Sequence, residues 1–182
     1  MCMSGVPSVT EATRGKAGTA FAGSGEQQSL QATALAPPGA VVIGSDHGGF
    51  DLKAQIVAHL TARGVAVEDV GCHSATRCDY PDIAALAGKA VADGRFKQGI
   101  VVCGSGIGIS IAANKVPGVR CALLHDHYGA VMCRRHNNAN MMALGGRVTG
   151  VEVAKEIVDA FLSTDFDGGR HEARVGKIMA IC

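Results

Sequence analysis

The sequence of 182 residues has no tryptophan, and aromatic side chains make up only 4% of it. A core with so few rings must be aliphatic, which favours parallel strands packed tightly beneath helices. The chain also lacks an apolar run of the ~18 residues that a membrane-spanning helix needs, so we expect no membrane partner. Its 17 Lys and Arg residues against 16 Asp and Glu give a net charge of +1, which excludes the broad positive field of a nucleic-acid-binding protein.

The cysteines and the first residues of the chain bear on its compartment and domain organisation. Seven cysteines are an odd number in a chain long enough to fold without a disulfide framework, and no secretory signal precedes them. We therefore predict reduced thiols and a cytoplasmic protein. Residues 1–39 are rich in small polar residues, lack hydrophobic periodicity and end in Ala36-Pro37-Pro38-Gly39. This composition predicts a disordered N-terminal extension, followed by one folded domain over residues 40–182.

Short β-branched runs alternate with helical patterns through the folded domain. The runs predict five strands, at residues 41–44, 65–70, 100–103, 119–124 and 141–144. Strands joined by helical crossovers are parallel, with right-handed connections. The sequence therefore predicts the α/β class, as a single three-layer α/β/α Rossmann-like domain with a five-stranded parallel sheet. Ligands of such sheets bind at the carboxyl ends of the strands, and we expect the site residues there.

Apolar spacing also predicts two buried helix faces. Leu52, Ile56 and Leu60 recur every four residues between the first two predicted strands. The same spacing recurs near the end of the chain, at Val153, Ile157 and Phe161. We expect each set to face the sheet.

Two glycine-rich turns follow predicted strands and carry reactive side chains. The first, Gly44-Ser45-Asp46-His47-Gly48-Gly49, sets a carboxylate beside an imidazole; the alternative is that Asp46 caps the next helix and His47 is a solvated loop residue. The second, Cys103-Gly104-Ser105-Gly106-Ile107-Gly108, leads into a predicted helix whose first amides attract an anion and stabilise a thiolate. Cys103 is thus a predicted base or nucleophile, unless it is an ordinary buried thiol.

Nucleotide and metal chemistry remain weaker alternatives. The second glycine run has Ile109 where the dinucleotide fingerprint has its third glycine, although Asp126 lies at a suitable distance along the chain. The pairs His125-x-His127 and Cys133-x-x-His136 have spacings that zinc ligands use, but several of these side chains point apart on the predicted helix. We therefore expect no metal and no cofactor.

Four further residues suit acid–base chemistry and substrate binding. His136 stands at the end of a predicted helix beside a polar residue, Asn137, which favours an acid or base next to a binding group. Arg170 and Arg174 are four residues apart and share one helix face. They can grip one phosphate, or they can form a solvated basic surface.

Taken together, these motifs resemble one family. Residues 41–181 are similar to the type B ribose-5-phosphate isomerases, which are grouped with galactose-6-phosphate isomerase subunits. The resemblance rests on the two glycine-rich runs, the continuation of the second through Ile109-Ser110-Ile111-Ala112-Ala113-Asn114-Lys115, and Asp79-Tyr80-Pro81, Arg135-His136-Asn137 and Gly168-Gly169-Arg170-His171. It implies a homodimer, with a tetramer left open, whose active sites lie between subunits. It also implies aldose–ketose isomerisation of a sugar phosphate without metal or nucleotide.

The resemblance also implies a role for each site residue. Cys103 is the base that moves a proton between C2 and C1, Ser105 stabilises the enediolate, and His136 opens the sugar ring with help from Asp46. The implied binding groups are the loop residues Gly104, Ser105, Gly106, Ile107 and Gly108, the sugar-lining Tyr80 and Asn137, and the phosphate grip of His47, Arg147, Arg170 and Arg174. Ser105 stands where many members have threonine, which keeps the hydroxyl but loses a methyl group.

The activity expected from these features is interconversion of ribose 5-phosphate and ribulose 5-phosphate in the non-oxidative pentose phosphate pathway. One alternative is an isomerase of a six-carbon sugar phosphate, allose 6-phosphate or galactose 6-phosphate. The other is a non-catalytic sugar-phosphate-binding module of the same fold. The presence of Cys103, Ser105 and His136 in one chain argues against the binding module.

Overall fold

The computed structural model describes residues 36–181, in which five strands form one parallel sheet. The strands are β1 (Val41–Ser45), β2 (Val67–Asp69), β3 (Gln98–Cys103), β4 (Cys121–Leu123) and β5 (Met141–Gly145), in the order β2-β1-β3-β5-β4. The predicted α/β fold with a five-stranded parallel sheet is confirmed. Residues 1–35 of the predicted extension lie outside the described residues. Ala36 already contacts the domain, because its amide donates to the Arg95 carbonyl at 3.2 Å.

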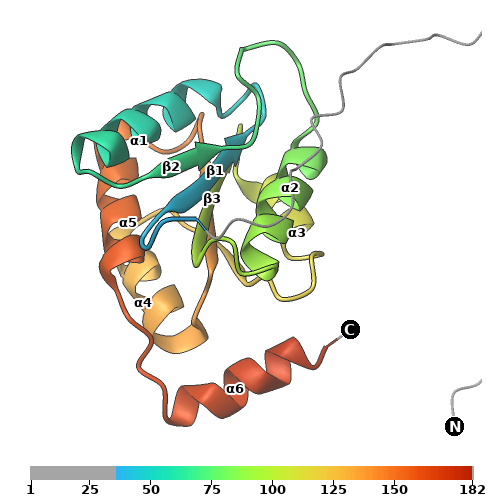
Figure 1. Ribbon diagram of the computed structural model, residues 1–182, viewed down its shortest axis with the longest axis vertical. Helices are drawn as coiled ribbons and strands as arrows, with labels where there is room; N and C mark the ends of the chain where they lie inside the picture. The colour runs from blue at the N-terminus through green and yellow to red at the C-terminus, as the bar shows by residue number, and fades with distance from the viewer. Residues whose placement is uncertain (1–35, 182) are drawn as a thin grey trace, which may run out of the picture. The chain divides into compact units, whose positions relative to one another are not determined.

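Helices cover both faces of the sheet. They are α1 (Phe50–Ala62), α2 (Tyr80–Ala92), α3 (Ile107–Ala113), α4 (His127–Asn137), α5 (Val151–Ser163) and α6 (Arg170–Met179). Helices α1, α4 and α5 pack on one face, α2 and α3 pack on the other, and α6 lies outside these layers at the bottom of Figure 1. None of the described helices is long and apolar enough to cross a membrane.

Because helices cover both faces of the sheet, the sequences of the central strands are continuous apolar runs. In β1, Val41 and Ile43 belong to the cluster beneath α1, α4 and α5, and Val42 belongs to the cluster beneath α2 and α3. All five residues of β1 are buried, as expected for a strand with helices on both sides. The core is aliphatic as predicted, with Phe96 and Phe161 as its buried phenylalanines.

The predicted buried face of α5 is wrong at its first position. Val153 is 45% exposed, whereas Ala154, Ile157, Val158 and Phe161 are buried. A strict four-residue spacing drifts by about 40° at each step around a helix of 3.6 residues per turn, so its first member leaves the stripe that faces the sheet. The buried stripe therefore follows mixed spacings of three and four residues.

The prediction that all thiols are reduced is also wrong at one pair. Cys72 and Cys78 form a disulfide across the loop between β2 and α2. The loop turns back on itself at Cys72, whose φ is +29°, and this brings the two Cα atoms to 6.7 Å. The free thiols among the described residues are those of Cys103, Cys121 and Cys133.

Candidate active site

The turn after β1 packs directly against the loop after β3 at the carboxyl edge of the sheet. The Asp46 amide donates to the Val102 carbonyl at 3.1 Å. A Cβ atom on Gly49 would lie 2.6 Å from the Val102 carbonyl oxygen, and one on Gly48 would lie 3.0 Å from the Gly104 nitrogen. Only glycines permit this approach of the two backbones. The sequence therefore brings Asp46 and His47 beside the Cys103 loop.

Asp46 has one oxygen committed to the turn and one without a partner. Its Oδ1 accepts hydrogen bonds from the amides of Gly48, at 2.8 Å, and Gly49, at 3.0 Å. The alternative that Asp46 caps the next helix is wrong, because both amides precede α1, whose N-cap Gly49 has no side-chain cap. Oδ2 has no hydrogen-bond partner among residues 36–181, although the residue is only 7% exposed. The carboxylate is consequently fixed in orientation while one oxygen stays free for a ligand.

Cys103 ends β3 at the base of the glycine loop and is 5% exposed. Its sulfur accepts a hydrogen bond from the Gly106 amide at 3.2 Å. That N–H points its positive end at the sulfur. Gly106 adopts φ +78°, and a Cβ on it would lie 2.6 Å from Leu123 Cδ1, so glycine is required for this loop path. Ser105 is exposed, and its Oγ accepts from the Ile107 amide at 3.3 Å.

Two side chains lie over the glycines of this loop. The Arg147 side chain covers Gly104, since a Cβ there would lie 3.5 Å from Arg147 Nε. The turn that carries Arg147 is tied to the loop by its own amide, which donates to the Gly104 carbonyl at 3.0 Å. The Tyr80 ring covers Gly108, where a Cβ would lie 2.7 Å from Tyr80 Cζ. A guanidinium and a phenol thus flank the predicted anion-binding amides.

The loop between β2 and α2 is anchored at both ends. At its far end, His47 Nδ1 lies 3.3 Å from the Cys78 carbonyl oxygen. At its near end, the Lys53 ammonium donates to both Asp69 carboxylate oxygens, at 2.7 and 2.6 Å, to the Cys72 carbonyl at 2.8 Å, and to the Gly71 carbonyl. Lys53 is 1% exposed. Sequence reasoning missed this residue, although it falls three positions before Ile56 on the predicted buried face of α1.

His136 and Asn137 lie at the opposite, amino edge of the sheet. Helix α4 begins directly after β4 and ends just before β5, so it runs back across the sheet for about 16 Å. Cys103 pairs with Gly145 at one end of the β3–β5 ladder, and Gly99 pairs with Met141 at the other. Four residues of strand separate these ends by about 13 Å. The expectation that all site residues lie at the carboxyl ends is therefore wrong for His136 and Asn137.

Arg170 and Arg174 also belong to the amino edge, because α6 packs against the last turn of α4. The His136 ring stacks on the ring of His171, with centroids 4.3 Å apart and planes 5° from parallel. Arg170 Nε donates to His171 Nε2 at 3.3 Å. Burial, followed by the charges of His136, Arg170 and Arg174, lowers the pKa of His171. The stack places the His171 imidazole against His136, and sequence reasoning gave His171 no role.

This cluster does not suit a metal ion. Ligand atoms of His136, Asp167 and His171 lie within 4.8 Å of one another, and no other such group of three occurs in residues 36–181. Asp167, however, is already paired with Arg135, whose Nε lies 3.0 Å from both carboxylate oxygens. That hydrogen bond lowers the pKa of Asp167. With Arg170 and Arg174 also nearby, the local charge opposes a cation and favours an anion.

The predicted site residues thus form two groups. We name the group at the carboxyl edge half-site C; its members are Asp46, His47, Tyr80, Cys103, Gly104, Ser105, Gly106, Ile107, Gly108 and Arg147. We name the group at the amino edge half-site N; its members are His136, Asn137, Arg170 and Arg174. One copy of the chain brings the residues of each half-site together and keeps the two half-sites apart.

Comparison with known proteins places this arrangement in a family. Ribose-5-phosphate isomerase B of Escherichia coli is 50% identical over 141 residues, which cover 78% of this chain and 95% of the relative. D-erythrulose-4-phosphate isomerase of Pectobacterium atrosepticum is 43% identical over 139 residues, covering 76% and 91%. The solved structure of Clostridium thermocellum ribose-5-phosphate isomerase B matches with a TM-score of 0.76 and 52% identity, covering 78% of this chain and 95% of that one. The Ribose/Galactose Isomerase profile matches residues 41–178, and the chain belongs to that family.

Proposed function

We propose that the chain is an aldose–ketose isomerase that interconverts ribose 5-phosphate and ribulose 5-phosphate. The observation that carries the proposal is the Cys103 sulfur, buried at the base of a glycine loop and facing the Gly106 amide at 3.2 Å. Isomerisation needs a base beside donors that hold an enediolate oxygen, and this loop supplies both. Family membership and the names of the relatives support the same reaction.

In the proposed mechanism, the Cys103 thiolate takes the proton from C2 of the open-chain aldose and returns it to C1. The electron pair of the C2–H bond forms an enediolate whose oxygen accepts hydrogen bonds from the Ser105 hydroxyl and the loop amides, and the O2 hydroxyl proton passes to O1 as the ketone forms. His136 and the free Oδ2 of Asp46 transfer the protons of ring opening. The phosphate is held by His47 and Arg147 of half-site C and by Arg170 and Arg174 of half-site N.

We propose further that half-site C of one copy faces half-site N of a second copy, in a cytoplasmic homodimer. The two edges are separated by about 13 Å of strand, so one copy cannot place Cys103 and His136 on adjacent atoms of one small sugar. A two-fold pairing of the chain creates two equivalent sites at once. The exposed Ile178 (44%), Met179 (40%) and Ile181 (78%) at the end of α6 supply apolar surface for such contact.

Mixed dimers test the shared site. Cys103→Ala and His136→Asn each disable both sites of their own homodimer. When the two variants are co-expressed and pair at random, about one quarter of all sites receive an intact Cys103 and an intact His136, so we expect about one quarter of wild-type turnover. Each variant expressed alone is the control. If each site were built from one chain, the mixture would stay as inactive as its components.

A substrate panel tests the reaction itself. Ribose 5-phosphate, allose 6-phosphate, galactose 6-phosphate and erythrulose 4-phosphate are compared by kcat/KM in the presence of a metal chelator. The four-carbon compound is included because a relative 43% identical is named for it. We expect ribose 5-phosphate to have the highest value. A higher kcat/KM for another sugar phosphate would make that compound the preferred substrate. Binding of these compounds without turnover of any of them would favour the non-catalytic module.

A further inference from the structure

We propose that Arg120 is the positioning residue of half-site N: one guanidinium holds the end of α4 and the end of α6 in a single arrangement. The inference rests on the proposed function, since it assigns a residue to one half of the proposed site. Arg120 directly precedes β4, and within residues 36–181 its side chain hydrogen-bonds to Asn137, Asn138 and Met179 and to no residue of half-site C. It acts through the backbone that carries His136 and Asn137.

The first contact of Arg120 is with the last carbonyls of α4. Its Nε lies 3.2 Å from the Asn137 carbonyl oxygen and 2.9 Å from that of Asn138, and its Nη2 lies 2.7 Å from the latter. Carbonyls in the last turn of a helix have no partner within the helix, and they carry the negative end of its dipole. A guanidinium there satisfies two of them and fixes the direction in which the chain leaves His136.

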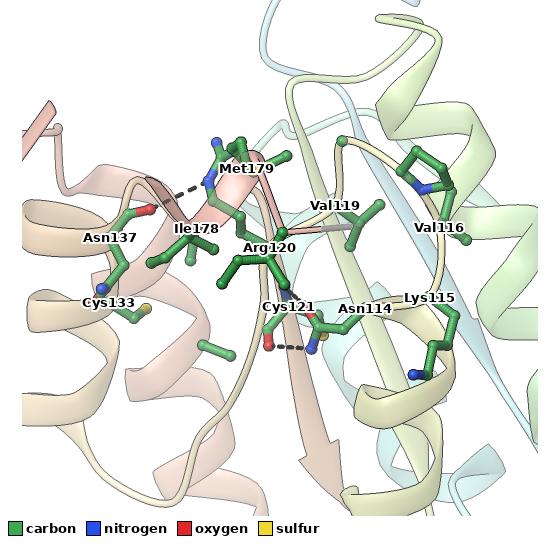
Figure 2. Close-up of a pocket in the computed structure, with 15 residues that line it drawn as sticks. Asn114, Lys115, Val116, Val119, Arg120, Cys121, Cys133, Asn137, Ile178 and Met179 are labelled. Carbon is green, nitrogen blue, oxygen red and sulfur yellow. Dashed lines mark hydrogen bonds between the residues drawn. The ribbon is translucent and has the colours of Figure 1, made fainter. Parts of the chain in front are cut away.

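The second contact of Arg120 is with α6. Its Nη1 lies 3.3 Å from the sulfur of Met179, the last residue of that helix. Figure 2 shows Arg120 between Asn137 and Met179, at a groove of about 870 Å³ bounded by the segment from α3 into β4, the end of α4 and the end of α6. Helix α6 is thus held against α4 near its start, by the stack of His136 on His171, and at its end by Arg120.

Arg120 is itself held in place. Its amide donates to the Asn140 side-chain oxygen at 2.7 Å, and the Asn140 side-chain nitrogen donates to the Gly118 carbonyl at 2.8 Å. Burial and the charge of Arg134 lower the pKa of Arg120. A half-buried cation in that position is tolerated because carbonyl oxygens compensate it. The guanidinium therefore has little freedom to leave the helix end.

Lysine cannot reproduce these contacts. Arg120 reaches Asn137, Asn138 and Met179 with three different nitrogens of one rigid plane. An ammonium group is a single point at the end of a flexible stem, so it can neutralise the helix end but cannot fix α4 and α6 together. Arg120→Lys therefore keeps the charge and removes the positioning.

The test compares Arg120→Lys with Arg95→Lys. Arg95 is a matched control, because its side chain is 20% exposed, its Nη2 lies 2.7 and 2.9 Å from the Glu68 carboxylate, and its guanidinium carbon lies 5.4 Å from the centre of the Phe96 ring. It touches neither α4 nor α6. We expect Arg120→Lys to lower kcat/KM for ribose 5-phosphate by about 10- to 100-fold, the cost of a misplaced catalytic group. Arg95→Lys should retain the wild-type kcat/KM. The two variants should change the melting temperature by similar amounts.

Mixed dimers separate positioning from folding. Co-expressed with Cys103→Ala, the Arg120→Lys chain supplies an intact half-site C and its partner supplies an intact half-site N. We expect turnover to return to about one quarter of wild type, as for the Cys103→Ala and His136→Asn mixture.

Three results would overturn this role. Wild-type kinetics in Arg120→Lys would contradict the role. A mixture of Arg120→Lys with Cys103→Ala that stays inactive, while the His136→Asn mixture recovers, would also contradict it, because Arg120 would then support the whole chain. Failure of both mixtures would remove the shared site and this role together. A wild-type protein without isomerase activity would instead overturn the proposed function.

Discussion

At the residue scale, Gly108 shows how a missing side chain shapes the site. A Cβ at this position would lie 2.7 Å from Tyr80 Cζ, at the far end of a side chain that can swing away. We therefore expect Gly108→Ala to leave stability almost unchanged and to raise the KM for ribose 5-phosphate about tenfold, by moving Tyr80 off the loop. A double-mutant cycle checks the cause, because Gly108→Ala should add much less in a Tyr80→Ala background. Equal effects in both backgrounds would show that Gly108→Ala does not act through Tyr80.

Two thiols that line the groove beside Arg120, Cys121 and Cys133, predict a loss of stability in alkali. Burial raises the pKa of Cys133 from 9.0 to about 11, and burial with the neighbouring Cys133 raises that of Cys121 to about 12. Above pH 9 the unfolded chain releases these protons while the folded chain keeps them. Their contribution to the free energy of unfolding is therefore complete below pH 9 and declines as the pH rises toward 11.

Urea unfolding at pH 8, 9 and 10 measures this decline, with Cys133→Ala as the comparison. Lysine and tyrosine side chains titrate in the same range, so the relevant quantity is the difference between the two proteins. We expect the wild type to lose more stability than Cys133→Ala over this interval. Parallel losses would show that the Cys133 thiol titrates alike in the folded and unfolded chains.

At the element scale, the loop between β2 and α2 joins stability to substrate binding. The Cys72–Cys78 disulfide closes the loop, whose Cys78 carbonyl contacts His47 and which leads directly into Tyr80. Replacing both cysteines with serine frees a closed segment of about seven residues, which should lower the free energy of unfolding by about 2 kcal/mol. It should also raise the KM for sugar phosphate while leaving kcat close to wild type, since Cys103 is untouched.

Dithiothreitol provides the control for that double variant. A dithiol transfers two electrons to the disulfide and becomes a cyclic disulfide itself, leaving Cys72 and Cys78 as thiols. The reduced wild type should then match the double variant in both KM and stability. A wild type that is indifferent to the reductant would contradict the role assigned to the loop closure.

The elements themselves were predictable where packing is two-sided and less so at the edges. The predicted strands at 41–44, 100–103 and 141–144 match β1, β3 and β5 to within two residues. The predicted strands at 65–70 and 119–124 shorten to Val67–Asp69 and Cys121–Leu123. Both are edge strands with one neighbour each, so a hydrogen-bond ladder on one side alone sets their length. Apolar patterning shows that a segment is buried but not where its hydrogen bonds stop.

At the scale of the whole molecule, the separation of the two half-sites follows from chain direction. A helix that connects parallel strands ends at the amino edge, so the place of His136 could have been read from the predicted order of elements. The contacts that hold it there could not, because Arg120, Asn137 and Met179 lie far apart in the sequence and no spacing rule links them. Local motifs identified most site residues, whereas their grouping required the fold.

The two half-sites lie entirely within residues 36–181, which bears on the first part of the chain. Deleting residues 1–35 leaves Ala36 and its hydrogen bond to the Arg95 carbonyl in place. We therefore expect the shortened chain to keep the kcat and KM of the full chain. A large loss of turnover would assign the N-terminal segment a part in the site or in the pairing of copies.

The central claim is that Cys103 carries the proton of an aldose–ketose isomerisation, and the most direct test is turnover of ribose 5-phosphate by the wild type and by Cys103→Ala side by side. The alanine variant should still bind the sugar phosphate, because the loop amides and the cationic residues remain. We predict chelator-resistant formation of ribulose 5-phosphate by the wild type, and a loss of at least about 1,000-fold in the variant, as expected on removal of a catalytic base. Turnover by Cys103→Ala within tenfold of wild type would contradict the account.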